Sequence, residues 1–138
     1  MHLALKQAML AQSKKEVPVG CVIVKDNQLV SSGFNSPISS NDASAHAEIN
    51  AIRSAGKKIK NYRLNDMDIY VTLQPCPMCI STIINARISK IFFGAYEKKN
   101  LSFDFMQSRI SKNSPAMIGG ILEKECASIL SDFFKNKR

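Results

Sequence analysis

The sequence lacks the features of a membrane or secreted protein. No apolar run approaches the ~20 residues that a helix needs to cross a bilayer. The N-terminal segment has no basic start, no long apolar centre and no small-residue cleavage site, so it does not read as a signal peptide. Four cysteines in 138 residues are too few for a disulfide scaffold and suit a reducing compartment. We therefore expect a cytoplasmic protein that does not act at a membrane.

Length and composition are those of an ordinary globular protein. With 138 residues, of which 45% are hydrophobic and 22% charged, the chain is expected to form a single domain over residues 1–138. The formal net charge is +8. Positive charge of this size favours solubility, and it also suits a polyanionic partner such as nucleic acid.

The hydrophobic pattern alternates between strands and helices after an initial hairpin. Strands are expected at 17–25, 29–35, 68–73 and 88–95. Helices are expected at 2–14, at 45–56 with Ser44 as its cap and Gly56 at its end, from Pro77 through 80–87, and over 121–134. Residues 96–117 give no clear pattern. This order predicts a mixed sheet covered by helices, an α/β sandwich.

Two cysteines lie three residues apart in the stretch T-L-Q-P-C-P-M-C, residues 72–79. Cys76 and Cys79 alone are compatible with a redox dithiol, with half of a structural zinc site or with part of a catalytic one. Their place at an expected helix start puts both sulfurs on one side of the first turn. Free N–H groups and the positive end of the helix dipole stabilise thiolates there.

His46 is the one credible nitrogen ligand, because the other histidine, His2, lies next to the terminus. With Cys76 and Cys79 it makes three zinc ligands, which leaves a position for water. A structural site needs four, and the fourth would have to come from Cys21 or Cys126, which we otherwise interpret as buried, inert thiols. The chain has no cysteines other than these four.

The segment H-A-E at 46–48 supplies a carboxylate close to the expected metal. The combination of H-x-E with a later P-C-x-x-C is the pattern of the zinc-dependent nucleobase deaminases. In that chemistry Glu48 is a proton carrier and not a ligand. A thioredoxin-like dithiol leaves the His-Ala-Glu segment unexplained.

The chain resembles the cytidine deaminase-like superfamily and, within it, the bacterial tRNA adenosine deaminases. The resemblance is carried by E-V-P-V-G-C-V-I-V, A-H-A-E-I-N-A-I-R, Y-V-T-L-Q-P-C-P-M-C and R-I-S-K-I-F-F-G-A. The segments N-Y-R-L (61–64) and S-D-F-F (131–134) point to the tRNA branch. With G-F-N-S-P-I (33–38) and G-I-L-E-K-E-C-A-S-I-L-S-D-F-F (120–134), these segments cover most of residues 16–95 and 119–134.

The resemblance implies a three-layer α/β/α sandwich with a five-stranded mixed sheet, a homodimer and one Zn²⁺ per subunit. It implies hydrolytic conversion of adenosine to inosine at the wobble position of a tRNA anticodon stem-loop. It assigns zinc binding to His46, Cys76 and Cys79, catalysis to Glu48, and contacts with the substrate to Asn35 and to the backbone of Ala47.

Two departures from the family leave the substrate open. Gln74 stands where the family usually has Glu, and residues 97–117 differ from the family's Gly/Ala/Ser-rich loop. A deaminase of free bases or nucleosides, of the guanine or cytosine type, is one alternative. A non-catalytic, zinc-stabilised RNA-binding module is another, although Glu48 speaks against it. Phosphate contacts are expected from basic residues, namely Lys57, Lys58, Lys60, Arg63, Lys98, Lys99, Lys135, Lys137 and Arg138.

Overall fold

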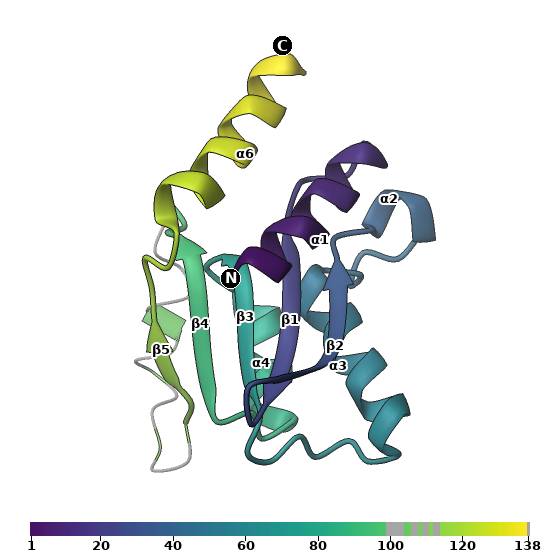
Figure 1. Cartoon of the computed structure of the whole chain (residues 1–138), viewed down its shortest axis with the longest axis vertical. Coiled ribbons are helices and arrows are strands. Elements are labelled where there is room, and N and C mark those ends of the chain that lie inside the picture. The colour runs from purple at the N-terminus through teal and green to yellow at the C-terminus, as the bar shows by residue number, and fades with distance from the viewer. Residues whose placement is uncertain (99–103, 106–107, 109–110, 112–113, 138) are drawn as a thin grey trace.

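A five-stranded mixed sheet lies at the centre of the computed structural model, which describes residues 1–98, 104–105, 108, 111 and 114–137 (Figure 1). The strand order is β2-β1-β3-β4-β5. β1 pairs antiparallel with β2 and β3, whereas β3, β4 and β5 run parallel. The strands are β1 (Gly20–Lys25), β2 (Gln28–Phe34), β3 (Asp68–Leu73), β4 (Lys90–Ala95) and β5 (Ala116–Ile118).

Helices cover both faces of this sheet. In Figure 1, α1 (His2–Ser13) and α6 (Glu123–Asn136) lie in front of it, and α3 (Ala47–Ile59) and α4 (Pro77–Asn85) lie behind it. The short α2 (Pro37–Ser40) belongs to the loop between β2 and α3. The predicted three-layer α/β/α sandwich is confirmed. Among the described residues, no helix has both the length and the apolar character that a bilayer crossing requires.

Close packing of α3 on β2 determines how near to the sheet α3 begins. Gly33 of β2 faces the backbone of Ala47 and Ala51, and a Cβ atom at Gly33 would collide with both. A larger residue at this position would push the start of α3 away from the sheet. The core next to α3 contains three fully buried isoleucine side chains, those of Ile23, Ile69 and Ile91.

The start of α3 differs from the sequence expectation. The N-cap is His46 in an extended conformation, and the helix begins at Ala47. Ser44 does not cap it, because the Ser44 hydroxyl donates a hydrogen bond to the Asp42 carboxylate at 2.7 Å. The polar residues before the helix therefore stabilise the loop and leave the N-cap to His46.

Two other elements also depart from the expected pattern. α3 continues through Gly56 to Ile59, and its C-cap Lys60 takes the left-handed conformation with φ of 56°. β5 falls in the stretch that gave no clear pattern, and it is a three-residue strand paired with β4 alone. A strand this short carries too few residues for alternation to be visible.

Candidate metal centre and active site

The candidate ligands sit at the first residues of two neighbouring helices. His46 is the N-cap of α3 and Cys76 is the N-cap of α4, both with extended backbone conformations. Cys79 follows in the first turn of α4, after Pro77 at its first position. Because α3 and α4 lie on the same face of the sheet, their starts bring the three side chains together (Figure 1).

The spacing of the three ligand atoms fits a tetrahedral zinc ion. The Nδ1 atom of His46 lies 3.6 Å from the Sγ atom of Cys76 and 3.5 Å from that of Cys79. All three ligand atoms lie within 4.8 Å of one another. Zinc–nitrogen and zinc–sulfur bonds of about 2.0 and 2.3 Å at a tetrahedral angle would separate these atoms by roughly 3.6 Å. These residues can therefore hold one zinc ion.

The other two thiols take no part in this cluster. Cys21 lies in β1 and Cys126 in α6, and both are fully buried, as expected. Burial raises the pKa of Cys21 well above its usual range and that of Cys126 to about 11. Within the part of the chain that the structure describes, the metal-binding group comprises three residues. Three protein ligands leave one position of a zinc ion open, as in catalytic sites.

Glu48 lies two residues after His46, inside the first turn of α3. Its side chain is 4% exposed. It is not a member of the metal-binding group. Burial is the main cause that raises the pKa of Glu48, the negative charge of Cys76 adds to it, and hydrogen bonds and the charge of His46 oppose it; the resulting pKa is about 7. A carboxyl group that titrates near neutral pH can both accept and donate a proton.

Comparisons with known proteins agree with this geometry. The family described as the cytidine and deoxycytidylate deaminase zinc-binding region matches residues 1–95. The chain belongs to this family. The tRNA-specific adenosine deaminase of Buchnera aphidicola subsp. Schizaphis graminum is 48% identical over 141 residues, which cover 100% of this chain and 93% of that protein.

Solved structures of the family share the fold. A structure from studies of A-to-I editing by tRNA:A34 deaminases at the wobble position has 36% sequence identity and a TM-score of 0.83. The alignment covers 94% of this chain and 97% of the chain in that structure. The guanine deaminase of Bacillus subtilis is also 36% identical, with a TM-score of 0.68, over 75% of this chain and 67% of its own.

The electrostatics of this deaminase site favour a thiolate at Cys76. A hydrogen bond from the Cys79 thiol and, to a smaller extent, the interaction with His46 outweigh the opposing effect of burial and together lower the pKa of Cys76 to about 4. The same contact raises the pKa of Cys79, because that thiol is the donor. A divalent cation between the two sulfurs would stabilise both thiolates. The donor set is therefore that of a zinc site, which agrees with the family.

Asn35 lies at the end of β2, and Ala47 follows the candidate ligand His46 in the chain. Asn35 follows β2 directly, is 8% exposed and donates its backbone N–H to the carbonyl of Val19 at 3.0 Å. Its carboxamide has no hydrogen bond within the described residues. Ala47 is the first residue of α3, where N–H groups have no acceptor within the helix. Both residues thus offer hydrogen-bonding groups that the fold does not use.

The structure explains why Gln74 is compatible with its position. Its side chain is 6% exposed, and its Oε1 atom accepts the backbone N–H of Glu97 at 3.0 Å. Its backbone N–H donates to the carbonyl of Ala95 at 2.9 Å. The position needs an acceptor oxygen, which Gln and Glu both provide. Most of the divergent 97–117 segment, Lys99 included, lies outside the described residues, as does Arg138.

Glu16 is a buried residue of this region that the sequence pattern did not single out. Its side chain is 1% exposed, and its carboxylate accepts the backbone N–H groups of Ser39 at 2.6 Å and of Ile38 at 3.4 Å. Burial raises the pKa of Glu16, but these hydrogen bonds and the charge of Lys137 outweigh it, and the pKa is lowered. The carboxylate therefore holds α2, which follows Asn35.

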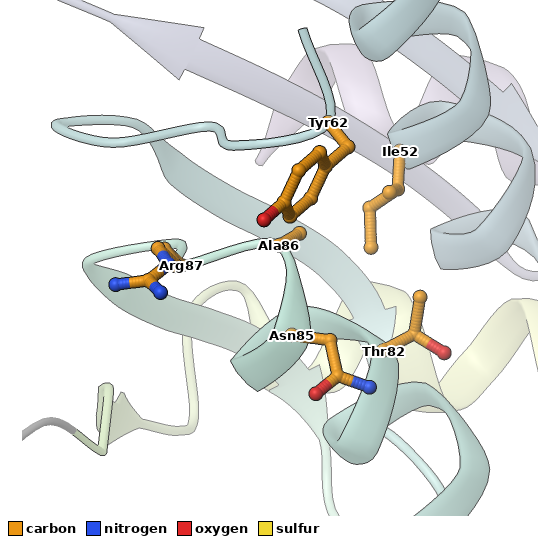
Figure 2. A pocket seen from close by; sticks show the side chains of 6 residues that line it. All are labelled: Ile52, Tyr62, Thr82, Asn85, Ala86 and Arg87. Atoms are coloured by element: carbon orange, nitrogen blue, oxygen red, sulfur yellow. The ribbon is translucent and has the colours of Figure 1, made fainter.

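At least three cavities lie beside the helices. A groove of about 560 Å³ runs between α6 and the carboxyl ends of β3 and β4, with Leu73, Tyr96, Lys98 and Phe134 among its walls. A second cavity, of about 440 Å³, lies at the far ends of α3 and α4. Figure 2 shows its walls, which contain none of the candidate site residues. The groove therefore borders Leu73, the last residue of β3 before the connection that carries Cys76.

Proposed function

We propose that this chain is a zinc-dependent hydrolase that deaminates adenosine to inosine at the wobble position of tRNA. The observation that carries the proposal is the cluster of His46, Cys76 and Cys79 beside the buried Glu48. It lies in a chain that aligns over its full length with a tRNA-specific adenosine deaminase. The cluster supports the proposed chemistry, and the similarity to the tRNA-specific adenosine deaminase supports the proposed substrate.

In this proposal His46, Cys76 and Cys79 hold one zinc ion. Bound zinc supplies a water molecule whose pKa is lowered towards ~7. Glu48 takes a proton from the attacking water and delivers it to a ring nitrogen of the adenine. It then takes the second proton from the newly added hydroxyl group and delivers it to the leaving amine. A carbon–oxygen bond forms at the attacked carbon, the carbon–nitrogen bond breaks, and the products are inosine and ammonia.

We assign substrate binding to Asn35 and to the backbone N–H of Ala47. Their unused polar groups suit the edge of a base that has left its stack to enter the site. Exposed lysines and arginines provide sites for phosphates around the molecule. They include Lys57 in the last turn of α3, Lys60 and Arg63 after α3, and Lys135 and Lys137 at the end of α6. We infer that the bound element is the anticodon stem-loop.

We also infer a homodimer of single-domain subunits that span residues 1–138. α4 carries no charged residue, and Met78 on it is 39% exposed. A helix face with these properties suits contact with a second copy. Sedimentation or light scattering that gives only the monomer mass would refute the dimer. The four free thiols fit a cytoplasmic location.

The test compares RNA with free substrates. The purified protein, loaded with zinc, is incubated with a transcribed tRNA that carries adenosine at the wobble position and, separately, with adenosine, guanine and cytosine. We expect inosine at the wobble position and ammonia in equal amounts. A matched tRNA with guanosine at that position is the control. Ammonia without any inosine in the tRNA would refute the proposed substrate.

A guanine deaminase is the second candidate. It is favoured by the 36% identity to the Bacillus subtilis enzyme and by the divergent segment after β4. That likeness covers 75% of this chain, whereas the tRNA deaminase relative covers all of it. Release of ammonia from guanine alone in the same assay would favour this candidate.

A further inference from the structure

The loop 36–45 separates Asn35 from His46, and its two ends are tied together. The backbone N–H of Ser36 donates to the carbonyl of Ala45 at 2.9 Å. One end thus lies next to the residue we assign to the substrate, and the other lies next to a metal ligand. A shift of either end of the loop would therefore change the distance between Asn35 and His46.

The side chain of Asn50 joins both ends of this loop. Its Nδ2 atom lies 2.8 Å from the carbonyl oxygen of Phe34, 3.0 Å from Oγ of Ser36 and 3.3 Å from the carbonyl oxygen of Ala45. Carbonyl oxygens only accept hydrogen bonds, so the atom among them has to be the NH₂ group. Two hydrogens therefore serve three acceptors.

Asn50 is itself held on a rigid element. It lies in α3, one turn beyond His46, and its backbone N–H donates to the carbonyl of His46 at 3.0 Å. Its amide reaches the residues on both sides of Asn35 along the chain, namely Phe34 and Ser36. The helix that begins with the metal ligand thereby also fixes the residue proposed to bind the base.

We propose that Asn50 is a positioning residue that fixes Asn35 relative to His46, and so sets where the substrate base lies against the metal centre. This inference rests on the proposed function of those two residues. Within the described residues, the side-chain hydrogen bonds of Asn50 reach neither the ligand atoms nor Glu48. Its loss should act on binding more than on the proton transfers.

The expected effect of removing the donor follows from this geometry. Asn50→Leu keeps the size of the side chain but leaves three acceptors without their shared donor. Asn50→Asp places a carboxylate oxygen among those acceptors, which is worse. We expect the KM for tRNA to rise roughly ten-fold, about the effect of one lost hydrogen bond, while kcat stays within about two-fold. The Kd for zinc should rise several-fold through His46.

The experiment measures kcat and KM on the tRNA transcript, and zinc Kd by competition with a chromophoric chelator, for the parent and both variants. Ser54→Ala, on the exposed side of the same helix, is the matched control. A purely structural role would lower the active fraction and therefore kcat, and would leave KM unchanged. Unchanged KM and zinc Kd in the folded variants would overturn the inference.

A double-mutant cycle tests whether Asn50 acts through Asn35. We expect Asn50→Leu to raise KM by less than about two-fold when Asn35 is already alanine. A ten-fold rise in that background would show independent effects and overturn the inference. If the parent protein deaminates no tRNA, the proposed function fails, but the zinc Kd of the Asn50 variants still tests the link to His46.

Discussion

The two helices that carry the candidate ligands reach the same point by different routes. α4 follows β3 through a short connection, Gln74 and Pro75, before the N-cap Cys76. α3 follows β2 through the longer loop 36–45 before the N-cap His46. The first route is set by neighbouring residues in the chain. The second depends on two side chains from outside the loop, Glu16 and Asn50, that hold the loop in place.

The largest expected effect comes from removing the ligand Cys76, which follows the short connection between β3 and α4. Cys76→Ala should lower the zinc content from about one ion per chain to below about 0.1 and abolish turnover, because two protein ligands hold zinc poorly. Metal analysis after dialysis measures this. Cys126→Ala removes a buried thiol outside the cluster and should retain the metal. Full zinc occupancy in Cys76→Ala would refute the ligand assignment.

A smaller effect is expected from breaking the second route at Glu16. Glu16→Ala removes the acceptor of two backbone N–H groups and should lower the free energy of unfolding by about 2 kcal/mol. Because the pKa of Glu16 is lowered in the fold, its carboxylate contributes stability at pH values above about 4.5, and this contribution is lost as pH falls through the lowered pKa.

Chemical denaturation between pH 3 and pH 7 separates these contributions. The difference in unfolding free energy between the parent and Glu16→Gln should be largest at neutral pH and should shrink on acidification. A difference that is constant over this range would mean that the charge of Glu16 does not stabilise α2.

The smallest effect is expected at Gln74, on the short route. Gln74→Leu leaves the N–H of Glu97 without its acceptor and should cost about 1 kcal/mol of stability. Gln74→Glu retains an acceptor oxygen and should keep both zinc content and stability close to the parent values. Thermal unfolding with zinc present measures the stability of both variants, and metal analysis measures their zinc content. Equal losses of stability in Gln74→Leu and Gln74→Glu would show that the hydrogen bond to Glu97 does not account for the contribution of Gln74.

The same comparison explains what could be predicted from the sequence. The strand, the proline and the two cysteines of T-L-Q-P-C-P-M-C are adjacent in the chain, and each favours the structure that forms. The positions of His46 and Glu48 at the start of a helix were predicted from a pattern of the same local kind. Here short-range preferences and the final fold agree.

The contacts that the sequence did not reveal are long-range. Glu16 meets its partners 22 and 23 residues away, and Gln74 meets Glu97 23 residues away. A Glu before a strand and an Asn inside a helix look like ordinary surface residues until the fold brings their partners close. Ser44 was predicted to be a helix cap because capping is local, but the competing contact with Asp42 prevails.

The measurement that tests the central claim most directly is made on Glu48→Gln. The claim is that three residues hold the metal while the buried carboxyl group moves protons. We predict that this variant binds one zinc ion per chain with the parent Kd and forms inosine in tRNA on the order of 10²–10⁴ times more slowly. Retention of more than about a tenth of the parent rate, or loss of the zinc ion, would contradict this account.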